Sequence, residues 1–193
     1  MASGWGPWLA TFLVLPFAFG CRGTSVKAPT SPESACVFGN ILVDEQYVPD
    51  AVVMHEVGEV YAPPFASPPT AHTFTNGDFF FENVKPGRYY LARIKLGNEL
   101  HTVAATSEAE LGPMVFEVAP GAVHYAGSLR MTTGGAPALG AGSSNIQRAA
   151  QPDPRTILEN LLPHLAKTGW DTRVRAQLGA LGTGARAADA VKH

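Results

Sequence analysis

The sequence predicts an all-β sandwich followed by a short α-helical tail. Between residues 36 and 133, short apolar or alternating runs are separated by Gly, Pro and Asn-Gly signals at regular spacing, with no long stretch of helical period. After residue 153, leucines recur at the spacing of an amphipathic helix. Hydrophobic residues make up 46% of the 193-residue chain, enough for a packed core.

The first 20 residues have the character of a signal peptide. No charged side chain occurs before Arg22, and the apolar run Trp8–Gly20 is too short to cross a bilayer core as a helix. The run ends in Ala18-Phe19-Gly20-Cys21, which resembles the lipobox of bacterial lipoproteins.

That resemblance implies cleavage before Cys21 and acylation of its thiol and new amino group. Two or more acyl chains hold a protein stably at a membrane, whereas one does so only marginally. Residues 21–35 would then be a lipid anchor and a flexible Pro/Ser/Thr-rich tether. In known lipoproteins an Asp after the acylated cysteine signals inner-membrane retention, so Arg22 implies the outer membrane. The alternative is a secreted or periplasmic protein, in which Cys21 and Cys36 form a disulfide.

Three segments carry the strand prediction. Asn76-Gly77 can supply the positive φ values of a tight turn, after which Phe79 and Phe81 point to one face and Phe80 to the other. Asn83–Leu91 contains a turn that leads into another strand. In the third segment, Val123–Met131, apolar residues alternate with mostly polar ones, which predicts one buried face.

The run Asn-Gly-Asp-Phe-Phe-Phe-Glu-Asn-Val-Lys-Pro-Gly-Arg-Tyr-Tyr-Leu, residues 76–91, resembles the signature of carboxypeptidase-regulatory-like domains. The segments 37–43, 48–53 and 120–127 resemble other strands of that group. The resemblance implies a seven-stranded transthyretin-like (prealbumin-like) antiparallel β-sandwich over residues 36–133. Such domains are mostly accessory, so the likeness identifies a fold better than an activity.

The composition changes after residue 133. Residues 134–152 are Gly/Ala/Ser-rich and predict a flexible linker, and residues 153–183 predict short helices. Asp153-Pro154 is a typical helix start, whereas Pro163 is expected to kink or split the helix. A helix this short is marginal alone, so we expect its leucine stripe to pack on its own sandwich or on a partner. Residues 184–193 are expected to form a frayed tail.

Few residues suggest chemistry. The histidines on or beside predicted strands, His55, His72, His101 and His124, are separated in sequence and have no metal-ligand spacing. Cys36 is expected to behave as a small buried hydrophobe if Cys21 carries lipid. We therefore expect no catalytic residue, no metal ligand and no cofactor.

The expected function is that of a non-catalytic cell-envelope lipoprotein, a binding or structural accessory module held to the membrane through Cys21. One alternative is a carbohydrate- or peptide-binding module serving a separate enzyme, with Phe80 and Tyr90 as its contact surface. A lower alternative is an envelope hydrolase with an unrecognised site. The expected partners are the membrane and an envelope protein or glycan, and a net charge of −2 argues against nucleic acid.

Overall fold

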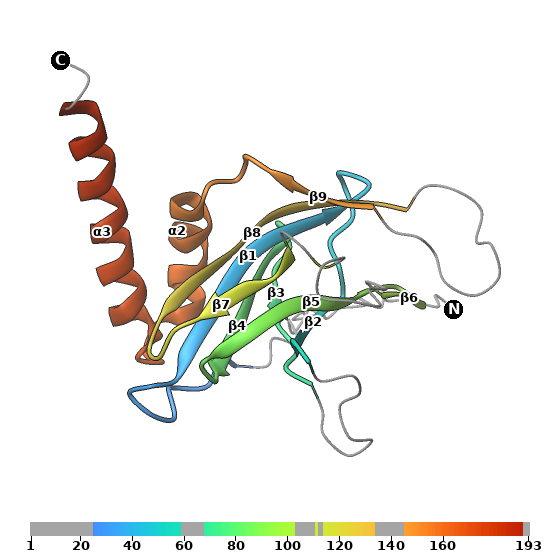
Figure 1. The fold of residues 1–193 in the computed structure, drawn as a ribbon, viewed down its shortest axis with the longest axis horizontal. Helices are drawn as coiled ribbons and strands as arrows, with labels where there is room; N and C mark the ends of the chain where they lie inside the picture. The colour runs from blue at the N-terminus through green and yellow to red at the C-terminus, as the bar shows by residue number, and fades with distance from the viewer. Residues whose placement is uncertain (1–24, 59–67, 103–110, 112–113, 134–144, 191–193) are drawn as a thin grey trace, which may run out of the picture.

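The computed structural model describes residues 25–58, 68–102, 111, 114–133 and 145–190 (Figure 1). The elements within these residues form two β-sheets, with helices packed on one of them. The strands within these ranges are β1 (Ala35–Val43), β2 (Ala51–Glu56), β3 (His72–Thr73), β4 (Asp78–Val84), β5 (Gly87–Leu96), β6 (Glu99–Thr102), β7 (Phe116–Val118), β8 (Val123–Thr132) and β9 (Asn145–Ala149). The helices are α2 (Pro154–Leu165) and α3 (Trp170–Ala190). The prediction of a β-rich, two-sheet fold with a helical tail is confirmed.

The sheets differ in size and in pairing. The larger one, called sheet A here, has the order β3-β4-β1-β8-β9, and all its neighbours are antiparallel except β1 and β8. The smaller one, sheet B, has the order β2-β5-β6, with β7 also paired to β5. The predicted Asn76-Gly77 turn joins β3 to β4, and Gly77 has a φ of 84°.

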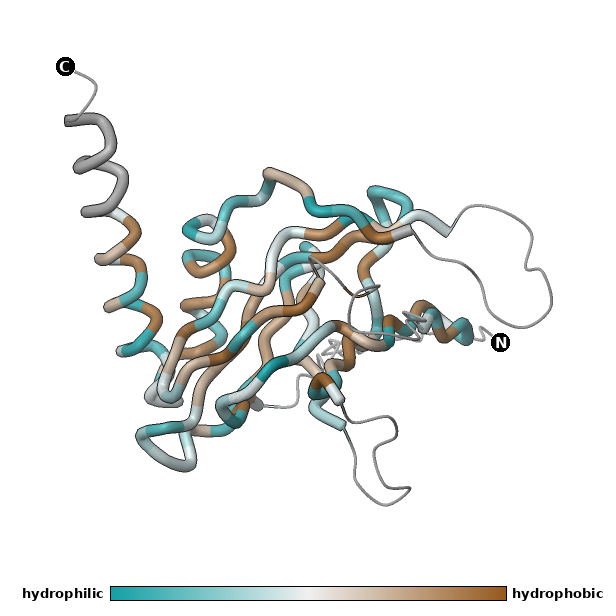
Figure 2. The backbone as a smooth tube through the Cα atoms, in the orientation of Figure 1, coloured by the Kyte–Doolittle hydropathy of each residue, from teal (hydrophilic) through white to brown (hydrophobic). Residues whose placement is uncertain are grey.

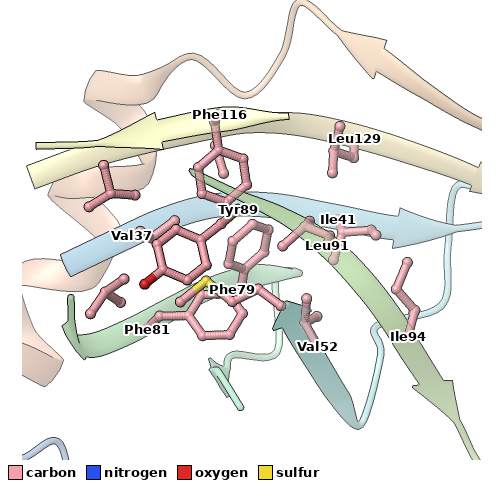
Figure 3. Packing of buried hydrophobic residues seen from close by; sticks show 14 of the residues in the cluster. Val37, Ile41, Val52, Phe79, Phe81, Tyr89, Leu91, Ile94, Phe116 and Leu129 are labelled. Atoms are coloured by element: carbon pink, nitrogen blue, oxygen red, sulfur yellow. The ribbon is translucent and has the colours of Figure 1, made fainter. Parts of the chain in front are cut away.

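A first hydrophobic core fills the space between the two sheets. Phe79 and Phe81 enter it from β4, with 0% and 1% of their surfaces exposed, and their rings meet edge to face at 5.8 Å. Tyr89, Leu91 and Ile94 of β5 oppose them from sheet B (Figure 3). The predicted alternation along β4 is therefore confirmed, because alternate side chains of a strand point to opposite faces.

A second core lies on the other face of sheet A, beneath the helices. The buried residues of this core are Cys36, Phe38, Phe80, Ile157, Leu158, Leu161, Leu165, Trp170 and Val174. Apolar positions alternate with polar ones along α2 and the first part of α3, as Figure 2 shows. The prediction that the leucine stripe packs on a surface is confirmed, and that surface is the chain's own sheet.

The helices follow the predicted start but not the predicted ends. Asp153 caps α2 by accepting a hydrogen bond from the Thr156 amide at 2.9 Å. Pro163 does not split the helix, because α2 continues through it to Leu165. The proline lies two residues before the helix end, where it removes only one backbone hydrogen bond. Helix α3 continues to Ala190, beyond the boundary expected at residue 183.

Two further expectations about sheet A need correction. Residues 145–149, inside the predicted linker, form strand β9 and pair with the exposed edge of β8. The simple alternation along β8 is interrupted by a register shift opposite Phe38 and Gly39 of β1. Val123 and Tyr125 consequently pack with the second core, whereas Leu129 and Met131 pack in the first.

Candidate functional site

The predicted contact surface of Phe80 and Tyr90 does not exist as one surface. Phe80 lies on β4 of sheet A and is fully buried beneath α2 and α3, with its ring 6.0 Å from that of Trp170. Tyr90 lies on β5 of sheet B, half-buried, near His55. The alternation of the sequence correctly predicted that Phe80 points away from the first core. It could not show that helices cover this outer face of sheet A.

The segment that precedes β1 is bound to the fold, contrary to the expectation of a flexible tether. The Trp170 Nε1–H donates to the carbonyl oxygen of Lys27 at 2.8 Å. The Lys27 amide in turn donates to the carboxylate of Glu82 on β4. Trp170 is itself fully buried, so residue 27 is fixed to the corner where α2 meets α3.

Further contacts hold the next residues of the same segment. Asn83 accepts from the Thr30 amide at 2.8 Å and donates to the Ala28 carbonyl at 3.1 Å. A Cβ atom at Gly169 would lie 3.3 Å from Cδ of Pro29, so the turn between the helices lies against this proline. The segment is therefore held from both β4 and the helices.

Arg173 completes this attachment from α3. Its guanidinium donates to the carbonyl oxygens of Ser34, Ser31 and Pro32 at 2.5, 3.3 and 3.4 Å. The same group lies 5.1 Å from the centre of the Trp170 ring, in a cation–π arrangement. One charged side chain thus satisfies three carbonyls of a segment that has no strand or helix of its own.

These contacts gather four loops at one end of the molecule, which we call the tether end: residues 25–34, 85–86, 119–122 and 166–169. The first loop contacts Asn83 next to the second loop, and Gly121 of the third donates its amide to the Glu33 carbonyl at 2.8 Å. The fourth contains Gly169. Sequence reasoning missed this site because Lys27 and Trp170 are 143 residues apart.

A buried polar cluster fastens α2 to sheet A. Asp78, 1% exposed, accepts from Asn40 at 2.8 Å, from Asn76 at 2.6 Å and from Asn160 of α2 at 3.1 Å. Arg130 donates to Asn40 at 3.1 Å. A buried carboxylate that accepts three hydrogen bonds is well satisfied, and here its partners join three separate parts of the chain. This cluster therefore helps to hold α2 against sheet A.

The histidines lie on different strands. His72 and Glu82 approach within 3.4 Å on the β3–β4 side, and His101 and Glu99 approach within 3.5 Å on β6. Among the described residues, no group of three or more His, Cys, Asp or Glu side chains could hold a metal ion. His72 instead neighbours the carboxylate that receives the Lys27 amide.

His124 of β8 lies against a core aromatic ring. It stacks on Phe116 at 5.1 Å with an interplanar angle of 19°, and its Nε2 is buried without a hydrogen-bond partner in the described part of the chain. Burial lowers the pKa of this imidazole below 6.5, and the positive charge of Arg148 lowers it further. The neutral ring therefore belongs to the packed edge of the first core.

Cys36 is a free thiol, fully buried in the second core. Burial raises its pKa to about 12, so the reactive thiolate is strongly disfavoured at neutral pH. The alternative of a Cys21–Cys36 disulfide stays an expectation, because only Cys36 belongs to the described residues. Cys21 and the predicted signal peptide lie outside the described residues.

No protein-family model and no curated protein sequence matches this chain. Within the described ranges, neither helix combines the length and apolar character needed to cross a bilayer.

Proposed function

We propose that this chain is a non-catalytic accessory lipoprotein of the bacterial cell envelope, acylated on Cys21. The observation that carries the proposal is the attachment of the chain to its own fold shortly after the lipobox-like sequence. Lys27 is only six residues from Cys21 and is held by Trp170 and Glu82. Such an attachment couples the position of the folded domain to whatever Cys21 carries.

The finer fold assignment is part of the same proposal. Two packed sheets, a turn at Asn76-Gly77 and a core built from Phe79 and Phe81 are what a transthyretin-like, carboxypeptidase-regulatory-like sandwich requires. The residues that resemble this group, 76–91, form β4, the following turn and the first part of β5. These features support the assignment.

The chemistry of the described residues supports an accessory role. The buried carboxylate of Asp78 is occupied by three amide donors, and the Cys36 thiol is held protonated by burial. The face of sheet A opposite the first core is covered by the chain's own helices. The Asp78 carboxylate and the Cys36 thiol thus serve the packing of the domain, which is the role expected of such groups in a non-catalytic accessory protein.

The test compares two cysteine variants in cells grown with an alkyne fatty acid. Cys21→Ala should abolish the label and move the protein from the membrane fraction to a soluble or unprocessed form. Cys36→Ala is the matched control, because it removes the other thiol and should keep both the label and the membrane location. Label retained on Cys21→Ala, or lost only in Cys36→Ala, would overturn the proposal.

A further inference from the structure

We infer that the tether end is the surface of this domain that faces the lipid bilayer, with the strands directed away from it. This inference rests on the proposed acylation of Cys21 and adds the orientation of the domain. Residues 25–34 are the described residues nearest in sequence to Cys21, and the 166–169 turn lies against Pro29 of this segment.

The reach of the chain limits how far the fold can lie from Cys21. Six residues from Cys21 to Lys27 span at most about 22 Å even when fully extended. The carbonyl of Lys27 is fixed by Trp170 at the corner of α2 and α3. That corner must therefore lie within about 22 Å of Cys21. This distance is shorter than the ten-residue strand β5, which is about 33 Å long.

The long strands run away from the tether end. β5 begins beside the 85–86 loop of the tether end and runs for ten residues, about 33 Å, to the turn at Asn98. In Figure 1, β5 and β6 extend away from the helix corner toward the opposite end of the molecule. An end-on orientation would therefore place Asn98 much farther from the bilayer than Ala166, which lies in the helix turn.

The charged side chains of the tether end are mostly basic. The four loops of the tether end contain three exposed lysines, Lys27, Lys85 and Lys167, and one carboxylate, Glu33. Lysines near an anionic bilayer surface are attracted by about 1 kcal/mol each. The exposed residues of these loops are otherwise small, polar or proline, which suits contact with hydrated headgroups more than insertion among acyl chains.

The competing orientation lays the domain flat. Tyr47 and Leu100 are the large apolar side chains with high exposure in the described part of the chain, at 50% and 57%. Leu100 pairs opposite Lys95 near the far turn, and Tyr47 follows the far end of β1. If these residues entered the bilayer, the far end would lie as close to the membrane as the tether end.

Fluorescence quenching on vesicles distinguishes the two orientations. The lipidated full-length product carries one fluorophore, attached either to Ala166→Cys or to Asn98→Cys, while the buried Cys36 remains unlabelled. Vesicles of phosphatidylcholine and phosphatidylglycerol contain a lipid with a nitroxide on its headgroup. We expect several-fold greater loss of emission at position 166 than at position 98. Equal loss, or greater loss at position 98, in vesicle-bound protein overturns the orientation.

Two controls separate this inference from the proposed function. Flotation and the intact mass of the protein first report whether it is acylated and bound; a protein that neither floats nor carries acyl mass overturns the anchor and the orientation with it. Insertion of a long Gly-Ser segment between Gly23 and Thr24 should leave flotation unchanged and reduce the difference between the two positions. An undiminished difference after insertion would show that chain length does not set the orientation.

Discussion

Replacing Phe80 by alanine tests whether the helices truly cover sheet A. The Phe80 side chain has no exposed surface, and complete burial of such a ring contributes about 1.5–3 kcal/mol before the cavity left by its loss is counted. With that cavity, Phe80→Ala should lower the free energy of unfolding by about 3–5 kcal/mol. About 0.5–1.5 kcal/mol of this loss should reflect the edge-to-face contact with Trp170.

Urea denaturation of a soluble form beginning at Arg22 measures this loss, because Trp170 is then the only tryptophan and reports on the second core. Phe79→Ala is the matched control, since Phe79 is equally buried but belongs to the first core. We expect similar losses for both variants. A loss below about 1 kcal/mol for Phe80→Ala beside 3–5 kcal/mol for Phe79→Ala would mean that this face of sheet A is open to water.

Three other predictions follow from the cores. Leu161→Asp combined with Leu165→Asp should detach the helices from sheet A and raise protease cleavage in the 134–152 region. The melting temperature should also fall, because Phe80 loses the helices that cover it. An unchanged protease pattern would contradict this prediction. Cys36 should react with a maleimide only in denaturant, so labelling of the native protein at neutral pH would be evidence against its burial. The pKa of His124 is lowered in the folded state, so a proton binds this side chain more readily in the unfolded chain. The free energy of unfolding should therefore fall as the pH drops below about 6.5. Urea denaturation at several pH values measures this dependence, and His124→Gln should make it weaker.

The sequence pattern correctly predicted those features of the fold that depend only on residues close together in the chain. The alternation of Phe79 and Phe81, the turn at Gly77 and the cap at Asp153 each depend on neighbouring residues, and each is present in the structure. Phe80 shows the limit of such patterns. Alternation gives the face to which a side chain points, but the residues that cover it, such as Trp170, come from a distant part of the chain.

The tether end could not be predicted for the same reason. Residues 25–34 have the composition of a linker, and nothing within the segment indicates that Trp170 and Arg173 bind its carbonyls. Strand β9 was also missed, because a short strand beside a Gly/Ala/Ser-rich run is defined by its partner β8 more than by its own residues. Contacts made through backbone atoms leave little trace in side-chain composition.

The most direct test of the proposed anchor is the mass of the N-terminal peptide of the protein isolated from membranes. Cleavage after lysine releases residues 21–27 if the signal peptide has been removed before Cys21, since Lys27 is the first lysine. The account predicts this peptide with added acyl and glyceryl mass. An unmodified peptide 21–27, or a peptide that still begins at Met1, would contradict the lipid anchor and with it the orientation of the domain at the membrane.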